Sequence, residues 1–200
     1  MDRADRWYFG GLLWVPGEHP AESVLEAVGL RDAIPVGYRT REEITSRSFG
    51  ANERLRALFR EAGWTFMLEP RGRRQSFRTL VPLSKRFGEA HAIAVDDLND
   101  IGEAASARDG VITGSAQVEG GECEIEGEPP KVELDAARSR DCVVGLLKKT
   151  TGLKLDQLVF FGTHEWAGSA QDVAIAAVLD HEPVAEVYRF TTPSYAPEAG

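Results

Sequence analysis

The stretch VITGSAQVEGGECEIEG, residues 111–127, decides the fold class, because it reads as two short strands with no helix between them. In its second half, glutamates alternate with cysteine and isoleucine, which is typical of a strand. The preceding run AHAIAVDD, residues 90–97, is also β-prone, and we expect residues 96–110, DDLNDIGEAASARDG, to form an acidic loop. Consecutive strands favour an α+β fold with a mixed or antiparallel sheet and three to four short helices over a doubly wound nucleotide fold.

Upstream of this stretch, predicted strands and helices alternate. Strands are expected at 7–15 and 64–68, and each is bounded by glycine or proline. The apolar spacing predicts a helix over 21–28 after Pro20, with Ala21, Val24, Leu25 and Val28 on one face and Gly29 at its end. It also predicts a helix capped by Asn52, with Leu55, Leu58, Phe59 and Ala62 on one face and Gly63 at its end. A third helix, capped by Ser76 or Thr79, is expected to end at Gly88.

Downstream, Pro129-Pro130 marks a break in the chain. We expect a helix capped by Asp141 and ended by Gly152, then a strand at 158–162 and a hairpin over 174–190. The predicted organisation is an α+β domain at 1–128 and a C-terminal α+β subdomain at 129–200 packed on the same core. The alternative is one domain over 1–195.

Composition limits the function. The 200 residues are 42% hydrophobic, enough for a core, and their formal net charge is −9. This acidity disfavours general nucleic-acid binding. No apolar run approaches the roughly 20 residues of a membrane span, and the N-terminus lacks an export signal, so a cytoplasmic protein with no membrane partner is expected. Cys123 and Cys142 then remain thiols.

Motifs for catalysis are missing. GLLKKTTG, residues 145–152, lacks the glycine that a phosphate loop needs before its lysine. The four histidines form no zinc pattern, and GxSxG is absent. His164 stands beside Glu165 in a glycine-flanked loop, where an acid/base pair or an ordinary loop are the alternatives. We therefore predict no metal and no cofactor, keep His164 as a binding candidate, and expect a non-enzymatic protein.

Positive charge is concentrated between Glu69 and Glu89, where the chain holds six basic side chains and no acid. Arginine guanidinium groups bind phosphates or carboxylates through paired donors, which lysine does not offer. We predict an exposed patch that serves recognition. The alternative is a solvated loop and helix face, matched by glutamates elsewhere in the chain. The candidate binding residues here are Arg71, Arg73, Arg74 and Arg78.

Negative charge is concentrated at Glu122, Glu124 and Glu126. Their alternation with apolar residues is typical of an edge strand whose charged face prevents aggregation. The alternative interpretation is an acidic platform for a basic partner, which makes these three glutamates further binding candidates.

A resemblance covers roughly the first half of the chain. GWTFMLEP at 63–70, the helix with LSKRFG at 83–88 and the strand HAIAV at 91–95 follow in an order that resembles a group of small actinobacterial domains of uncharacterised function. GLLWVPGEHPAESVLEAVG, residues 11–29, is similar to their opening strand and helix. The arginine loop and the C-terminal part depart from that pattern. The resemblance implies no catalytic residues, and it implies a bacterial cytosolic accessory or defence-associated protein.

These observations predict a binding protein, of an immunity or inhibitor type, whose acidic surface meets a protein with a basic surface. The alternative is a small enzyme or a nucleotide-binding or phosphate-binding module. In that case the arginine loop is the one place where a nucleotide or nucleic acid is expected to bind.

Overall fold

The computed structural model describes residues 11–30, 33–39, 53–69, 75–96, 99–128, 132, 138–153 and 185–191. These residues form one nine-stranded sheet in the order β2-β9-β3-β4-β1-β5-β6-β7-β8, in which every neighbouring pair is antiparallel. The strands are β1 (Gly11–Pro16), β2 (Ile34–Arg39), β3 (Glu53–Glu61), β4 (Trp64–Glu69), β5 (Glu89–Asp96), β6 (Ile101–Arg108), β7 (Val111–Glu119), β8 (Glu122–Gly127) and β9 (Ala185–Thr191). The predicted α+β class is confirmed, with an antiparallel sheet.

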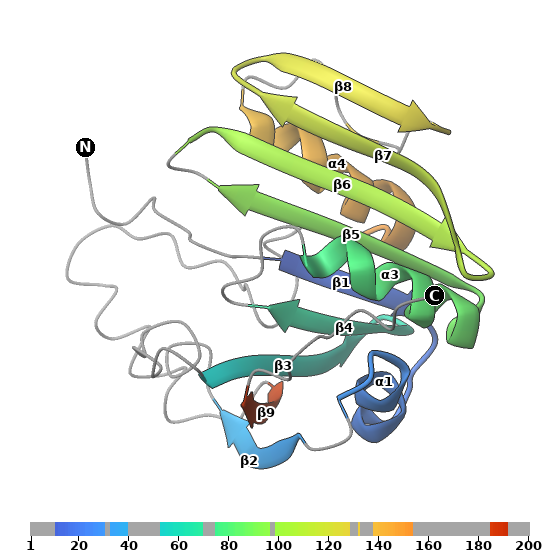
Figure 1. Cartoon of the computed structure of the whole chain (residues 1–200), viewed down its shortest axis with the longest axis vertical. Coiled ribbons are helices and arrows are strands. Elements are labelled where there is room, and N and C mark those ends of the chain that lie inside the picture. Colours follow the sequence, from blue (N-terminus) through green and yellow to red (C-terminus); the bar gives the residue numbers. More distant parts are fainter. Residues whose placement is uncertain are drawn as a thin grey trace, which may run out of the picture.

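Three described helices pack on the two faces of this sheet: α1 (Ala21–Ala27), α3 (Gln75–Phe87) and α4 (Ser139–Thr151). Figure 1 shows α1 and α3 in front of the sheet and α4 behind it. One apolar cluster joins the front face of the sheet to α1 and α3, and a second joins the back face to α4. The sheet therefore separates two cores, and we call its two sides the α3 face and the α4 face.

The central strand β1 shows how the sequence builds both cores. Leu12 and Trp14 belong to the cluster under α4, whereas Leu13 and Val15 belong to the cluster under α1 and α3. Successive side chains of a strand point to opposite faces, so a strand covered on both faces needs an unbroken apolar run. GLLWV meets that need, and its five residues are all buried.

The helix predicted after Asn52 is wrong, because residues 53–61 form β3. Ala57 and Phe59 face α4, whereas Leu58 faces α3, which is the two-residue period of a strand. Ala62 and Gly63 both have positive φ, 49° and 80°, and join β3 to β4. A two-residue turn with positive φ at both positions fits the twist of a hairpin, so Gly63 closes a β-turn rather than a helix.

The acidic loop predicted over 96–110 is also wrong in most of its length, because residues 101–108 form β6 between β5 and β7. Its small residues are poor strand formers by propensity. Burial explains them: α3 and α4 both pack against this strand. A Cβ atom on Gly102 would lie 2.5 Å from the carbonyl oxygen of Ser139 at the start of α4.

The other described elements follow the predictions closely. The strands predicted at 64–68, 90–97 and 111–127 and the helix predicted over 21–28 are confirmed. Helix α3 begins earlier than predicted, at Gln75, so that Pro82 lies inside it. Helix α4 begins at Ser139 instead of after an Asp141 cap and ends, as predicted, at Gly152 with φ 78°.

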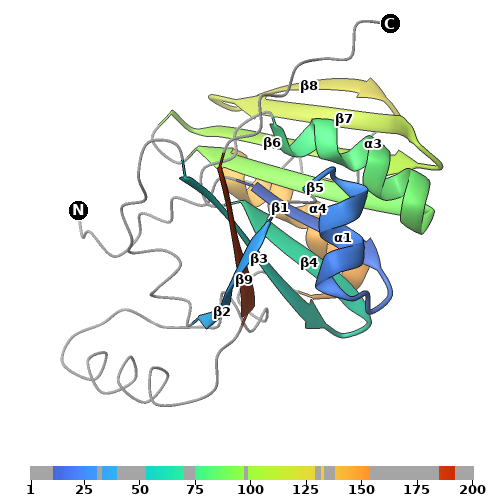
Figure 2. The ribbon, with the colours of Figure 1, turned by 60° about the horizontal axis from the view of Figure 1, so that its bottom comes forward.

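The C-terminal strand β9 pairs with both β2 and β3, as Figure 2 also shows. Residues near the end of the chain thus join the N-terminal half of the sheet. The predicted strand at 158–162 and the first half of the predicted 174–190 hairpin lie outside the described residues. The division at residue 128 stays a prediction.

Candidate protein-binding surface

The hairpin of β7 and β8 ends the sheet opposite to β2. Gly120 and Gly121, with φ 55° and 88°, form its two-residue turn, and Glu119 and Glu122 flank this turn as direct partners. Among the described strands, β8 has one neighbour, β7. The prediction that the glutamate strand is an edge strand is therefore confirmed.

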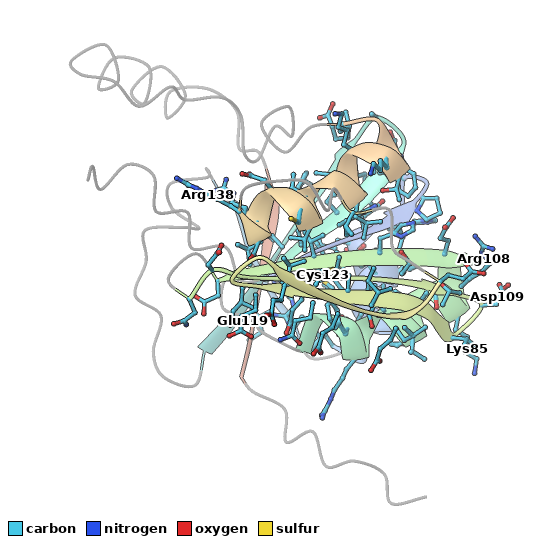
Figure 3. The ribbon with its side chains drawn as sticks, turned by 90° about the horizontal axis from the view of Figure 1, so that it is seen from above. Lys85, Arg108, Asp109, Glu119, Cys123 and Arg138 are labelled. Atoms are coloured by element: carbon cyan, nitrogen blue, oxygen red, sulfur yellow. The ribbon has the colours of Figure 1, made fainter. Side chains whose placement is uncertain are left out.

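Side chains of β8 alternate between the two faces of the sheet. Cys123 and Ile125 pair with Val118 and Ala116, which belong to the cluster on the α4 face. The glutamates at 122, 124 and 126 therefore project on the α3 face. All six residues of β8 are exposed. In Figure 3, Glu119 lies near the turn end of this hairpin, and Lys85 and Arg108 lie near the other end.

Two more glutamates share that face. Glu103 of β6 pairs with Gln117, which in turn pairs with Glu124, so this row crosses three strands. Glu119 pairs with Glu122 at the turn. We call the set the acidic face, and its members are Glu103, Glu119, Glu122, Glu124 and Glu126.

Helix α3 covers only part of this side of the sheet: it packs on β1 and β5, also contacts β6 and β7, and leaves the glutamates of β8 exposed. In Figure 1 it lies in front of β1 and β5, while β7 and β8 extend beyond it. Its exposed side carries Arg78, Lys85 and Arg86. The structure thus places Arg78 on the same side of the sheet as the predicted glutamates. Arg71, Arg73, Arg74 and His164 lie outside the described residues, so their recognition role stays a prediction.

A buried histidine on the α4 face is a feature that the sequence analysis missed. His91 is 4% exposed, and its ring stacks on Trp14 with centroids 5.6 Å apart. Its Nδ1 lies 2.9 Å from the hydroxyl of Ser106, and its Nε2 lies 3.3 Å from a carboxylate oxygen of Glu89. The sequence held one sign of this burial: the alternation of HAIAV places residue 91 on the same face of the strand as Ile93.

The chemistry of this group favours a structural role. A hydroxyl, an imidazole and a carboxylate in series are the parts of an activated serine nucleophile. Here, however, the imidazole is buried among rings, with Trp64 6.3 Å away as well, and both of its nitrogens have partners. Buried polar groups need such partners. We therefore assign His91 to the packing of β5 against β1 and β6.

Within the described ranges, no three His, Cys, Asp or Glu side chains gather in a way that could hold a metal ion. The helices seen in the same ranges are too short or too polar to cross a membrane. No protein-family model, curated protein or solved structure matches this chain. Among the described residues, the acidic face and the exposed strand β8 are the features that bear on function.

Exchanging Glu119 for lysine is expected to raise the melting temperature by about 1–2 °C. The reason is that Glu119 and Glu122 are directly opposite each other, where like charges destabilise a sheet and opposite charges stabilise it. Thermal unfolding followed by circular dichroism measures the change. Glu18→Lys, at an exposed position outside the sheet, makes the same charge change and is the matched control. An equal rise in both variants would assign the effect to net charge instead of this pair.

Proposed function

We propose that this protein is a non-enzymatic binding protein whose acidic face recognises a basic surface on another protein. The observation that supports the proposal most strongly is the gathering of five glutamates on one face of β6, β7 and β8, at a strand whose six residues are all exposed. Complementary charge speeds the encounter of two proteins and selects against wrong partners.

Charge also narrows the class of partner. Phosphate groups are repelled by an acidic face, which argues against a nucleic acid at this site. A protein whose binding surface is rich in lysine and arginine fits it. An inhibitor or immunity-type protein that covers a basic toxin or effector is the kind of protein that uses such a surface, and Arg78 on α3 would supply a second, oppositely charged contact beside it.

The test is capture of a partner from the native host on immobilised protein at low and at high salt. We expect a partner that is retained at low salt, released at high salt, and lost when Glu122, Glu124 and Glu126 are all changed to glutamine. Salt screens exposed charges beyond about 10 Å at 0.1 M, so release by salt reports on electrostatic attraction. These side chains are exposed, and the variant is expected to have a melting temperature equal to or slightly above that of the wild type, because it also removes the repulsion between Glu119 and Glu122.

A matched variant makes the test specific. Changing Glu18, Glu22 and Glu26, all exposed and outside the β7–β8 hairpin, removes the same charge and should leave capture unchanged. Equal loss in both variants would mean that net charge, and not the acidic face, attracts the partner. If the variant with glutamine at positions 122, 124 and 126 still retained the partner at low salt, the proposal would be contradicted.

A further inference from the structure

We infer that the free edge of β8, the one that pairs with no other described strand, binds an extended segment of the partner as an additional antiparallel strand, in which lysine or arginine alternates with apolar residues. This inference rests on the proposed function and specifies how the acidic face recognises its partner. Proteins recognise extended peptides at exposed sheet edges in this way, with backbone hydrogen bonds supplying affinity and alternate side chains supplying specificity.

The register of the hairpin shows which backbone groups face the free edge. In a two-residue hairpin, the residues that flank the turn exchange both hydrogen bonds, and bonded and non-bonded pairs then alternate. Glu119 and Glu122 flank the turn, so residues 122, 124 and 126 direct their N–H and C=O groups toward β7. The N–H of Glu128 donates to the carbonyl of Thr113 at 2.9 Å, which continues the same alternation.

Cys123 and Ile125 consequently direct their N–H and C=O groups away from β7, toward the free edge. An incoming antiparallel strand would exchange hydrogen bonds with these two residues. Its side chains at those positions would lie on the α4 face, beside Cys123 and the 39% exposed Ile125. Apolar or β-branched residues suit those positions.

The remaining residues of the incoming strand would lie opposite the glutamates in non-bonded pairs. Such pairs bring Cα atoms to about 4.5 Å, closer than the bonded pairs at about 5.5 Å. A lysine or arginine there would stand directly across from Glu122, Glu124 or Glu126 on the α3 face. The edge therefore selects a strand with cations at every second residue.

A second copy of this chain does not fit the edge. If two β8 strands paired in antiparallel fashion through Cys123 and Ile125, even-numbered residues would face even-numbered residues. Each of the three glutamates would then oppose a glutamate, and directly opposed like charges destabilise a sheet. The same charges protect an edge strand against pairing with itself and leave it open to a basic strand. The occupant is thus a basic segment of another protein.

Synthetic peptides test the inference without a known partner. The probe is a fluorescein-labelled peptide with four lysines alternating with three valines, and its affinity is measured by fluorescence anisotropy at low salt. A block isomer with four lysines followed by three valines has the same composition and charge. We expect the alternating peptide to bind about tenfold more tightly, because it alone can place three lysines across from Glu122, Glu124 and Glu126 at the same time.

Backbone methylation separates strand pairing from charge attraction. In the antiparallel arrangement, the valine N–H groups face β8 and the lysine N–H groups face away. N-methylation of the valines should weaken binding about tenfold or more through loss of the hydrogen bonds to Cys123 and Ile125. N-methylation of the lysines is the matched control, with binding within about threefold of the parent peptide. On the protein, Ile125→Pro removes one edge N–H, spares the bonds to β7, and should weaken binding similarly.

The outcomes distinguish this inference from the proposed function. If binding is tight, sensitive to salt and dependent on the three glutamates, yet unaffected by valine methylation and by the order of the residues in the peptide, that result would contradict the added strand and leave the proposed function intact. Affinity that is unchanged by salt and by the glutamine variant would count against the acidic face as a recognition site. Because the methylated peptides leave the protein unaltered, the result does not depend on how well Ile125→Pro folds.

Discussion

Replacing Trp14 with alanine is expected to lower the free energy of unfolding by about 3–5 kcal/mol, the range for removing a large buried aromatic side chain. Trp14 is 1% exposed on the central strand, and it touches both neighbouring strands through Phe66 and His91. Its indole N–H donates to the Thr150 hydroxyl of α4 at 3.1 Å. The substitution therefore removes core volume and a link between the sheet and α4.

For a chain of this size, the loss corresponds to a melting temperature lower by about 6–20 °C. Thermal and urea unfolding measure it. Trp14→Phe separates the two contributions, because it keeps an aromatic ring and loses the hydrogen bond to Thr150. We expect it to recover more than half of the stability. A decrease below about 1 kcal/mol for the alanine variant would contradict the position of Trp14 in the core.

Replacing Gly114 with alanine is expected to cost about 3 kcal/mol or more, at the upper end of the range for overpacked sites. A Cβ atom at this position would clash with the carbonyl oxygen of Glu128, directly after the end of β8. The opposing atom belongs to the backbone, so no side-chain rotation relieves the clash. The end of β8 must move away from β7.

Ser115→Ala is the neighbouring control, because its side chain lies on the other face of β7, and we expect a change within about 0.5 kcal/mol. Hydrogen exchange of the β8 amides locates the effect: faster exchange in Gly114→Ala, confined to β8 and its neighbours, is the expected pattern. A Gly114→Ala variant as stable as the wild type would mean that the Glu128 carbonyl does not lie so close to Gly114.

Parts of the fold could be predicted from the sequence where local pattern and tertiary environment agree. Helix α1 has apolar residues at helical spacing and glycine at its end, and β8 alternates strictly, so both were identified. β3 could not be, because its charged and apolar residues also fit a helical face. What distinguishes it is its pairing with β9, more than 120 positions later in the chain.

The sequence did not predict β6 for a different reason. Its alanines and serine lack strand propensity. Small side chains suit this strand because helices pack on both of its faces, and that packing is visible only in the tertiary structure. In the candidate site, too, some residues could be predicted from the sequence and others could not. The glutamates of β8 were identified from alternation alone, whereas Glu103 and Glu119 joined them only through the register of β6, β7 and β8. His91 was passed over because its partner Ser106 lies on the strand that was not predicted.

The most direct test of the acidic face as the recognition site is photo-crosslinking within the native host. A benzophenone amino acid is placed at position 117, where Gln117 lies between Glu103 and Glu124 in the register, or at position 22, on the exposed side of α1. We expect one dominant crosslinked protein from position 117, with a basic sequence at the crosslinked segment, and little of it from position 22. Crosslinking of the same partner from position 22 and not from position 117 would contradict the acidic face as the recognition site.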